Sequence, residues 1–478
     1  MHRLALVLTS MLFAANCVKV IIDTDGIVDD ARAVTLALQH PDIQVELNQL
    51  KSTVMVVAIT TVHGGPAVEQ ATINVKRVVK ANGLDVPVYK GANDSLVGRH
   101  PIVIDDKLFG YDGLGAVHDT RPKPEFKYAN GDSDEHAVDA ILRLTKEISD
   151  LTIICIGPLT NIALALKKDP EFAKRPAKLV IMGGNYLGMG NVMQSLTAEW
   201  NFHCDPEAAS LVLQSMRCPV RILPWEASFF RNQYPSINYE THLHHNTSIS
   251  NFLHNITGAT RKFYSSHGFQ YAYCDEAAVG LVFDEIAKKT ILLRGNVELN
   301  GTFTRGQLAI DWLNTKWDNK VKSYVADEIE NPPRPFEFVV QIDAELLDKW
   351  MNRATVIDGE DNEKIYRLSD EERKWVEIDE LLEQGRFGVA SLNGKIYITG
   401  GSGGREALKF CLCFNFAAPV GSRISRIADM NYERWNHSLI VANEKLYAIG
   451  GRELLCKSIE EYDLQTNKWR TVGRLKFE

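Results

Sequence analysis

Four aspartates stand within eight residues near the start of the chain. Residues 18–34 read VKVIIDTDGIVDDARAV, with Asp23, Asp25, Asp29 and Asp30 between an apolar run and a helical pattern. Like charges this close repel one another unless protons or a cation offset them. Carboxylate oxygens suit hard cations such as calcium or magnesium. The spacing therefore predicts a cation site, and solvated turn aspartates are the alternative.

An EF-hand does not explain this loop. It requires glycine at position six and glutamate at position twelve. Counting from Asp23, those positions hold Val28 and Val34.

The flanking elements determine where the aspartates point. Residues 18–22 are apolar apart from Lys19, which is typical of a strand covered on both faces of a parallel sheet. Apolar residues at helical spacing follow Asp30 and predict a helix that begins at about Asp29. Ligands of open α/β sheets bind beyond the carboxyl ends of the strands. The four carboxylates are therefore predicted to face the active cleft.

The same alternation continues to about residue 355 and predicts an α/β fold with an open, mostly parallel sheet flanked by helices. Strand-like runs cover 54–62, 151–159, 177–184 and 219–225, and helical patterns cover 69–81 and 160–168.

Composition narrows the function. The 478 residues are 45% hydrophobic and carry a formal net charge of −8, without a dense basic stripe, which argues against nucleic-acid binding. The eight cysteines lack metal-like pairing, and Cys411 and Cys413 stand too close together for a zinc knuckle. Most are expected to be buried thiols.

Residues 1–17 have a basic start, an apolar run and small residues after it, as a secretory signal peptide does. The run is too short to span a membrane. We therefore expect a secreted protein without a membrane partner. The alternative is that these residues form a buried N-terminal strand or helix, in which case the protein would be cytoplasmic. Glycosylation triplets occur at Asn93, Asn246, Asn255, Asn300 and Asn436.

Together, the motifs resemble the inosine-uridine type nucleoside hydrolase family over about residues 18–355. The family opens with DxDxGxDD, and the four aspartates keep that spacing. The motifs that follow in the family's order are AITTVHGG at 58–65, GPLTNIALAL at 157–166, MGG at 182–184, EWNFHCDPEAA at 199–209 and CDEAAVG at 274–280.

This resemblance implies a ligand set and a mechanism. Calcium would be held by Asp25, Asp30, the main-chain carbonyl of Thr160 and Asp275. Asp25 would also accept the proton of the attacking water. The ribose hydroxyls would be bound by Asp29, Asn191, Glu199 and Asn201.

Several of these residues have purely structural alternatives. Thr160 and Asn161 also fit a cap of the helix that follows them. Asp205 precedes Pro206 and is expected to be such a cap.

The sequence departs from the family pattern at four places. Ile27 stands where the family has glycine, with Gly26 one place early, and Gly65 replaces an asparagine. The segment between Asn191 and Glu199 is two residues longer than usual, and Cys274 replaces a histidine that precedes the last metal aspartate. A thiol is a poor acid at neutral pH.

Aromatic stacking of the base is an alternative to that histidine. The segment FYSSHGFQYAYC at 263–274 contains His267, Tyr271 and Tyr273, and we expect His267 and Tyr271 to contact the substrate. Packing in the core is the alternative for these aromatic residues.

The run VIIDTDGIV also resembles the strand end of haloacid-dehalogenase-type phosphatases. The motifs at 157–166 and 199–209 have no role in that family and argue against it.

The tail differs in pattern. After the polar linker IDGEDNEK, residues 365–478 are short β runs, and Gly400-Gly401 recur 50 residues later as Gly450-Gly451. With Tyr462 and Trp469, and with Tyr366 and Trp375, this segment resembles kelch repeats. A closed propeller needs about four to eight blades, so two blades imply either a protein partner or a fragment joined to the hydrolase by a gene-model error.

We therefore expect a calcium-dependent hydrolase that cleaves the N-glycosidic bond of ribonucleosides and forms a homo-oligomer. The alternative is a catalytically impaired binding protein of the same fold, or a kelch-type adaptor.

Overall fold

The computed structural model describes residues 17–39, 53–98, 106–116, 135–192, 195–229, 236–269, 271–313, 335–356, 364–369, 374–380, 387–393, 395–403, 406–415, 424–435, 437–443, 445–451 and 457–475. The chain divides into two units, residues 1–357 and 358–478. The proposed signal peptide falls almost entirely outside the described residues.

Within the described residues, the first unit contains an eight-stranded sheet with the order β3-β2-β1-β4-β5-β6-β10-β7. Only β7 among these strands runs antiparallel to its neighbour. The strands are β1 (Cys17–Thr24), β2 (Thr53–Thr61), β3 (Val88–Lys90), β4 (Leu151–Cys155), β5 (Lys178–Met182), β6 (Val220–Leu223), β7 (Ala287–Leu293) and β10 (Phe336–Ile342). The predicted, mostly parallel α/β sheet is confirmed.

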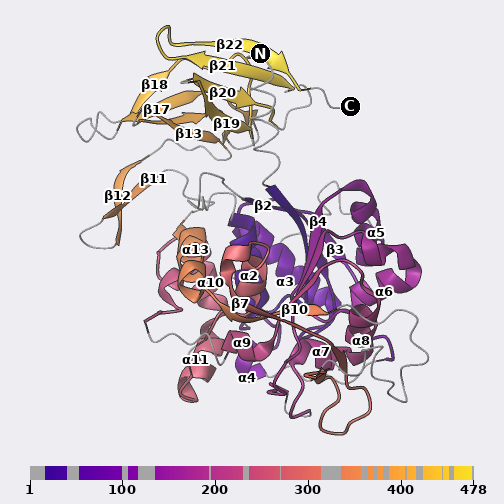
Figure 1. Ribbon diagram of the computed structural model, residues 1–478. Coiled ribbons are helices and arrows are strands. Elements are labelled where there is room, and N and C mark those ends of the chain that lie inside the picture. The colour runs from indigo at the N-terminus through magenta and orange to yellow at the C-terminus, as the bar shows by residue number, and fades with distance from the viewer. Residues whose placement is uncertain are drawn as a thin grey trace. The chain divides into compact units, whose positions relative to one another are not determined.

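Helices cover both faces of this sheet (Figure 1). The helices are α2 (Val28–Gln39), α3 (Val68–Ala81), α4 (Asp106–Phe109), α5 (Ala137–Glu147), α6 (Thr160–Lys168), α7 (Trp200–Cys204), α8 (Pro206–Ser215), α9 (Trp225–Phe229), α10 (Ser248–Ile256), α11 (Gly258–Ser266), α12 (Asp275–Gly280) and α13 (Ala344–Val356). Shorter elements are the 3-10 turns η2 (Pro170–Lys174), η3 (Thr241–Leu243) and η4 (Asp284–Ile286), and the strand pair β8 (Gly295–Val297) and β9 (Leu308–Ile310).

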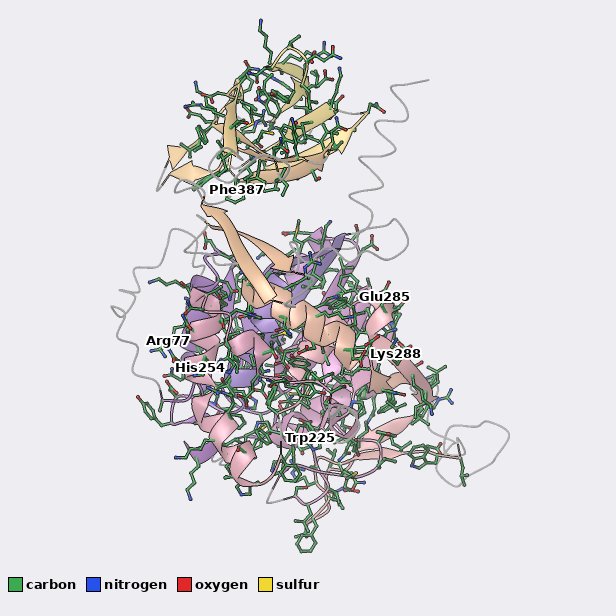
Figure 2. All side chains as sticks on the ribbon, turned by 90° about the vertical axis from the view of Figure 1, so that its left-hand side faces the viewer. Arg77, Trp225, His254, Glu285, Lys288 and Phe387 are labelled. Carbon is green, nitrogen blue, oxygen red and sulfur yellow. The ribbon has the colours of Figure 1, made fainter. Side chains whose placement is uncertain are left out.

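Strand β1 contributes to two hydrophobic cores because successive side chains of a strand point to opposite faces. Val20 and Ile22 pack with α2, α3, α12 and α13. Ile21 packs with α5, α6 and α8 on the other face. Trp225, labelled in Figure 2, opens α9 and packs against the first core. This two-sided burial explains why residues 18–22 are nearly all apolar.

The second unit is all β. Its strands are β11 (Lys364–Ser369), β12 (Lys374–Glu380), β13 (Gly388–Leu392), β14 (Lys395–Thr399), β15 (Ser402–Gly403), β16 (Glu406–Ala407), β17 (Cys411–Asn415), β18 (Ile424–Ile427), β19 (Ser438–Ala442), β20 (Lys445–Ile449), β21 (Ser458–Asp463) and β22 (Lys468–Arg474). Within the described residues, these strands form two antiparallel four-stranded sheets, with the orders β13-β14-β17-β18 and β19-β20-β21-β22. Strand β11 pairs with β12. This arrangement fits the predicted kelch-like tail.

The repeated glycine pairs have a structural role in both sheets. Gly400 and Gly450 follow β14 and β20 and adopt positive φ angles of 63° and 68°, which favour glycine. Arg434 and Glu460 form a buried ion pair of 2.7 Å in this unit.

Six cysteines of the described residues are buried free thiols, as expected. No helix in the described parts of the chain has the length and apolar character needed to cross a bilayer.

Candidate active site

The end of β1, the loop after it and the first turn of α2 bring the four aspartates to the carboxyl edge of the sheet. Gly26 makes the turn with a φ of 70°, and a Cβ atom there would lie 2.7 Å from the main-chain oxygen of Ala71. Only glycine fits this position. Gly26 therefore supplies the turn, although the family pattern places its glycine at position 27.

Asp25 is buried, and the backbone amide of Gly65 donates to its Oδ2 at 2.7 Å. A Cβ atom at Gly64 would lie 2.0 Å from the same oxygen, so glycine at position 64 permits the close approach of this loop. Burial raises the pKa of Asp25 to about 6, and the negative charge of Asp29 acts in the same direction.

Asp30 is fixed at the start of α2. Thr24 Oγ1 and the amide of Ile27 donate to its two carboxylate oxygens. Burial, together with Asp25 and Asp29, raises its pKa well above the ordinary value.

Asp275 opens α12 and faces the same cluster. Asp275 is 3% exposed. Burial raises its pKa well above the ordinary value, as do the charges of Asp29 and Asp30. Asp29, Cys274 and Asp275 offer ligand atoms that all lie within 4.8 Å of one another. Because buried carboxylates need protons or a cation, these donors fit a divalent ion.

The Asp23 side chain belongs to a buried hydrogen-bond network that links neighbouring segments. Its Oδ1 accepts hydrogen bonds from Thr60 Oγ1 at 2.6 Å and from Asn161 Nδ2 at 2.8 Å. Burial raises its pKa to about 7. Asn161 also binds the main chain at Thr61 and Ala92. The side chain of Asn161 thus ties three segments together and does not cap α6.

Thr160 is the first residue of α6 and is fully buried. Its hydroxyl donates to Asp205 Oδ2 at 2.7 Å and lies 2.9 Å from His63 Nε2. Asp205 caps α8 by accepting from the amide of Ala208, which confirms the expected cap.

Glu199 and Asn201 lie where β4 and β5 end. The Glu199 carboxylate accepts from the amides of Gly184, Asn201 and Phe202 at 2.8, 2.8 and 3.1 Å. Burial nevertheless raises its pKa to about 7. Asn201 Nδ2 donates to the main-chain oxygens of Ile156 and Met182, both at 3.1 Å. Both side chains are therefore held rigidly at the same edge as Asp25.

The other three predicted substrate contacts have different surroundings. Asn191 is exposed, and its backbone N–H donates to the main-chain oxygen of Ala198. His267 is exposed at the end of α11, where its Nδ1 lies 2.8 Å from the Phe263 oxygen. Tyr271 is buried, and its hydroxyl donates to Glu276. Their contact with a nucleoside stays a prediction.

Sequence reasoning missed the buried ion pair behind the cluster. Arg32 Nε lies 2.9 Å from Glu276 Oε1, with the side chains 2% and 0% exposed. The Arg32 guanidinium carbon also lies 3.9 Å from the centre of the Tyr271 ring. The sequence contained one indication of this pair, because Arg32 is the only charged residue in the otherwise mostly apolar segment ARAVTLAL.

The departures at positions 27 and 65 lie against each other. A Cβ atom at Gly65 would lie 2.7 Å from Ile27 Cγ2, and one at Gly113 would lie 3.1 Å from the same methyl. Ile27 therefore fills the space into which a side chain at position 65 would extend.

Known proteins are similar to this chain over the region that contains the carboxylate cluster. A family model described as inosine-uridine preferring nucleoside hydrolase matches residues 20–346, and a kelch motif matches 434–476. The inosine-uridine preferring nucleoside hydrolase of Leishmania major is 30% identical over 297 residues, 62% of this chain and 88% of that protein.

Probable uridine nucleosidase 1 of Oryza sativa subsp. japonica is 36% identical over 198 residues. The match covers 41% of this chain and 55% of that relative, so the chain spans about half the length of this curated plant protein. A solved inosine-guanosine nucleoside hydrolase aligns with a TM-score of 0.60 and 28% identity, over 71% of this chain and 98% of that chain.

Proposed function

Because the chain belongs to the inosine-uridine preferring nucleoside hydrolase family, we propose that it hydrolyses the N-glycosidic bond of ribonucleosides in a calcium-dependent reaction. The observation that carries this proposal is that the buried carboxylates of Asp25, Asp30 and Asp275 lie near enough to raise one another's pKa. The products are the free base and ribose.

Asp25, Asp30, Asp275 and the carbonyl of Thr160 would hold the calcium ion. A calcium ion held there would lower the pKa of a bound water molecule and hold that water in place. The role of Asp25 is to accept the proton of that water. Burial raises the pKa of Asp25 to about 6 in the metal-free protein, and a bound cation would favour the carboxylate form that accepts a proton.

The remaining carboxylates and amides suit the sugar. Cleavage passes through an oxocarbenium-like sugar, which nearby negative charge stabilises. Glu199 is fixed by three backbone amides and Asn201 by two carbonyls, so neither has to reorganise. With Asp29 and Asn191, they would bind the ribose hydroxyls.

One observation favours a second candidate, a binding protein without turnover. Ile27 fills the space into which a side chain at position 65 would extend. Position 65 therefore contacts Asp25 through its backbone amide, where the family pattern has an asparagine side chain.

A ribose-release assay decides between the two candidates. The metal-stripped protein is given calcium and a panel of purine and pyrimidine nucleosides. We expect ribose from the wild type and about 10²–10⁴-fold less from Asp25→Asn, because the amide cannot accept a proton. Nucleoside binding, measured by calorimetry, should persist in the variant.

Binding without ribose release by the wild type would establish the binding-protein reading. Equal turnover by Asp25→Asn and wild type would refute the role of Asp25 as base. An Asp139→Asn control makes the same chemical change at a partly exposed side chain that pairs with Lys168, and it should leave ribose release unchanged.

A further inference from the structure

His63 connects two parts of the candidate site without belonging to its predicted ligands. It lies two residues after the end of β2, is 7% exposed, and has its Nε2 2.9 Å from Thr160 Oγ1. Two residues further on, the backbone N–H of Gly65 donates to Asp25 Oδ2 at 2.7 Å. One short segment therefore contacts both the residue whose carbonyl would hold calcium and the carboxylate that would act as the base.

The directions of the hydrogen bonds place a proton on the His63 ring. The Thr160 hydroxyl has one hydrogen and donates it to Asp205 Oδ2 at 2.7 Å. The Asp205 carboxylate also accepts from the amides of Leu96 and Ala208, at 2.9 and 3.0 Å, and such bonds favour its charged form. Because its hydrogen is committed, Thr160 Oγ1 accepts from the imidazole. His63 Nε2 is therefore the donor.

These bonds form a chain that runs from His63 through Thr160 to Asp205. Thr160 is the first residue of α6, and Asp205 caps α8. The chain thus ties the segment after β2 to the starts of two helices. Thr160 and Asp205 are fully buried, so removal of the His63 donor leaves the Thr160 oxygen short of a partner in a buried site, which is costly.

We propose that His63 is a positioning residue, whose protonated Nε2 holds the Thr160 hydroxyl and so fixes the Thr160 carbonyl relative to Asp25. This inference deepens the proposed function and rests on it, because the carbonyl matters as a ligand of the proposed calcium ion. Residues that hold metal ligands in place change metal affinity by about 10–100-fold when they are replaced.

The proton on the ring is measured first, in the full chain without metal. Proton–nitrogen-15 correlation spectra distinguish a protonated ring nitrogen from an unprotonated one, and the loss of a signal in His63→Gln assigns it. We expect a proton on His63 Nε2 at about pH 7.5, where an ordinary histidine is mostly neutral. A neutral ring that carries its proton on Nδ1 overturns the inference.

Calcium affinity, measured by calorimetry, tests the consequence. His63→Leu removes the donor and keeps an apolar side chain, and its calcium affinity should fall about 10–100-fold. His63→Gln places an amide N–H where the ring has Nε2, so most of the affinity should return. A role in packing alone predicts the opposite order, because leucine suits a buried position better than glutamine does.

Two further variants locate the effect. In a Thr160→Val background, His63→Leu should lower calcium affinity much less than in the wild type, because the hydroxyl through which it acts is absent. His437→Leu is the matched control, since His437 is also 7% exposed and its Nε2 lies 2.8 Å from Thr399 Oγ1 in the second unit. This control should change neither calcium affinity nor ribose release.

Unchanged calcium affinity in His63→Leu, or no recovery in His63→Gln, overturns the inference. Where circular dichroism shows that His63→Leu does not fold, Thr160→Val takes its place in the comparison with His63→Gln.

The proposed function is judged separately, on ribose release by the wild type. Ribose release with unchanged affinity in His63→Leu would refute only the role of His63. The expected order of affinities without ribose release would refute only the hydrolase proposal. A wild type that binds no calcium would contradict both, and this is recognised before any variant is compared.

Discussion

At the scale of single residues, the site is a set of carboxylates held in an environment that opposes their ionisation. Burial raises the pKa of Asp23 and Glu199 to about 7 and that of Asp25 to about 6. Protonation therefore favours the folded state. The stability that these groups contribute is complete below their ordinary values of 3.8 and 4.5 and is lost as the pH rises through 6 to 7.

This linkage predicts a pH-dependent effect of Asp25→Asn on the metal-free protein. The amide resembles the protonated acid, so below the ordinary aspartate pKa of 3.8 the variant and the wild type should melt at similar temperatures. Near pH 7.5 the wild type has to ionise Asp25, so the variant should melt a few degrees higher. Other titrating groups, such as His242, whose pKa is lowered by burial, change the stability of both proteins equally. Their contribution therefore cancels when the two melting temperatures are compared.

Thermal unfolding in EDTA at several pH values measures this difference. A difference that shrinks with rising pH would contradict the raised pKa of Asp25. Added calcium should reverse the order near pH 7.5, because the ion stabilises the carboxylate but not the amide.

The contact between Ile27 and Gly65 gives a second prediction. Gly65→Ala should cost about 1–3 kcal/mol of unfolding free energy, the usual cost of overpacking, because the new methyl would lie 2.7 Å from Ile27 Cγ2. In an Ile27→Ala background that methyl is absent, and the same substitution should be nearly neutral. Urea unfolding measures both costs.

Ile27→Val is the matched control, because valine retains the methyl that causes the clash. Gly65→Ala should remain costly in that background. Equal costs in the alanine and valine backgrounds would show that the departures at positions 27 and 65 are independent.

At the scale of elements, α2 and α12 converge on the site, and a buried pair joins them. Arg32 of α2 pairs with Glu276 of α12, and Tyr271 both stacks on the guanidinium group and donates to the carboxylate. The ring face of Tyr271 that meets Arg32 is therefore unavailable to a nucleoside base. The pair fixes the first turns that carry Asp30 and Asp275.

Arg32→Met should destabilise the protein by about 3–5 kcal/mol, because it leaves the buried Glu276 carboxylate without its counter-charge. Combining it with Glu276→Gln should recover much of that loss, since both charges are then removed. Chemical denaturation of the two variants measures the recovery. A double variant as unstable as the single one would show that packing of Arg32 on Tyr271 matters more than charge.

At the scale of the whole molecule, the chain consists of two units with separate cores. The cores of the first unit extend to Ala354, and that of the second unit begins at Leu392. All the proposed ligands of the cation precede residue 276.

Truncation after Ile357 should therefore leave a folded protein with unchanged cation affinity. Circular dichroism and calorimetric titration with calcium measure the two properties. Loss of folding on truncation would show that the β unit is integral to the first one. Truncation within α13, after Asp348, serves as the destabilised reference, because it removes Trp350 and Met351 from the core.

The sequence determined what depends on local pattern. The apolar run before Asp23 and the helical spacing after Asp30 define a strand, a loop and a helix, because burial of a face imposes a period on the residues that supply it. The ordered motifs from residue 58 to 280 identified the family, and the repeated glycine pairs identified the tail.

Only the tertiary structure decided how the side chains are used. Glu199 meets the Gly184 amide, Ile27 fills the space beside Gly65, and Tyr271 packs on Arg32. The partners in each case come from separate elements of the chain, and local periodicity carries no information about which distant residues meet. The same holds for Cys274, whose thiol meets the Asp29 carboxylate only because α12 packs against α2.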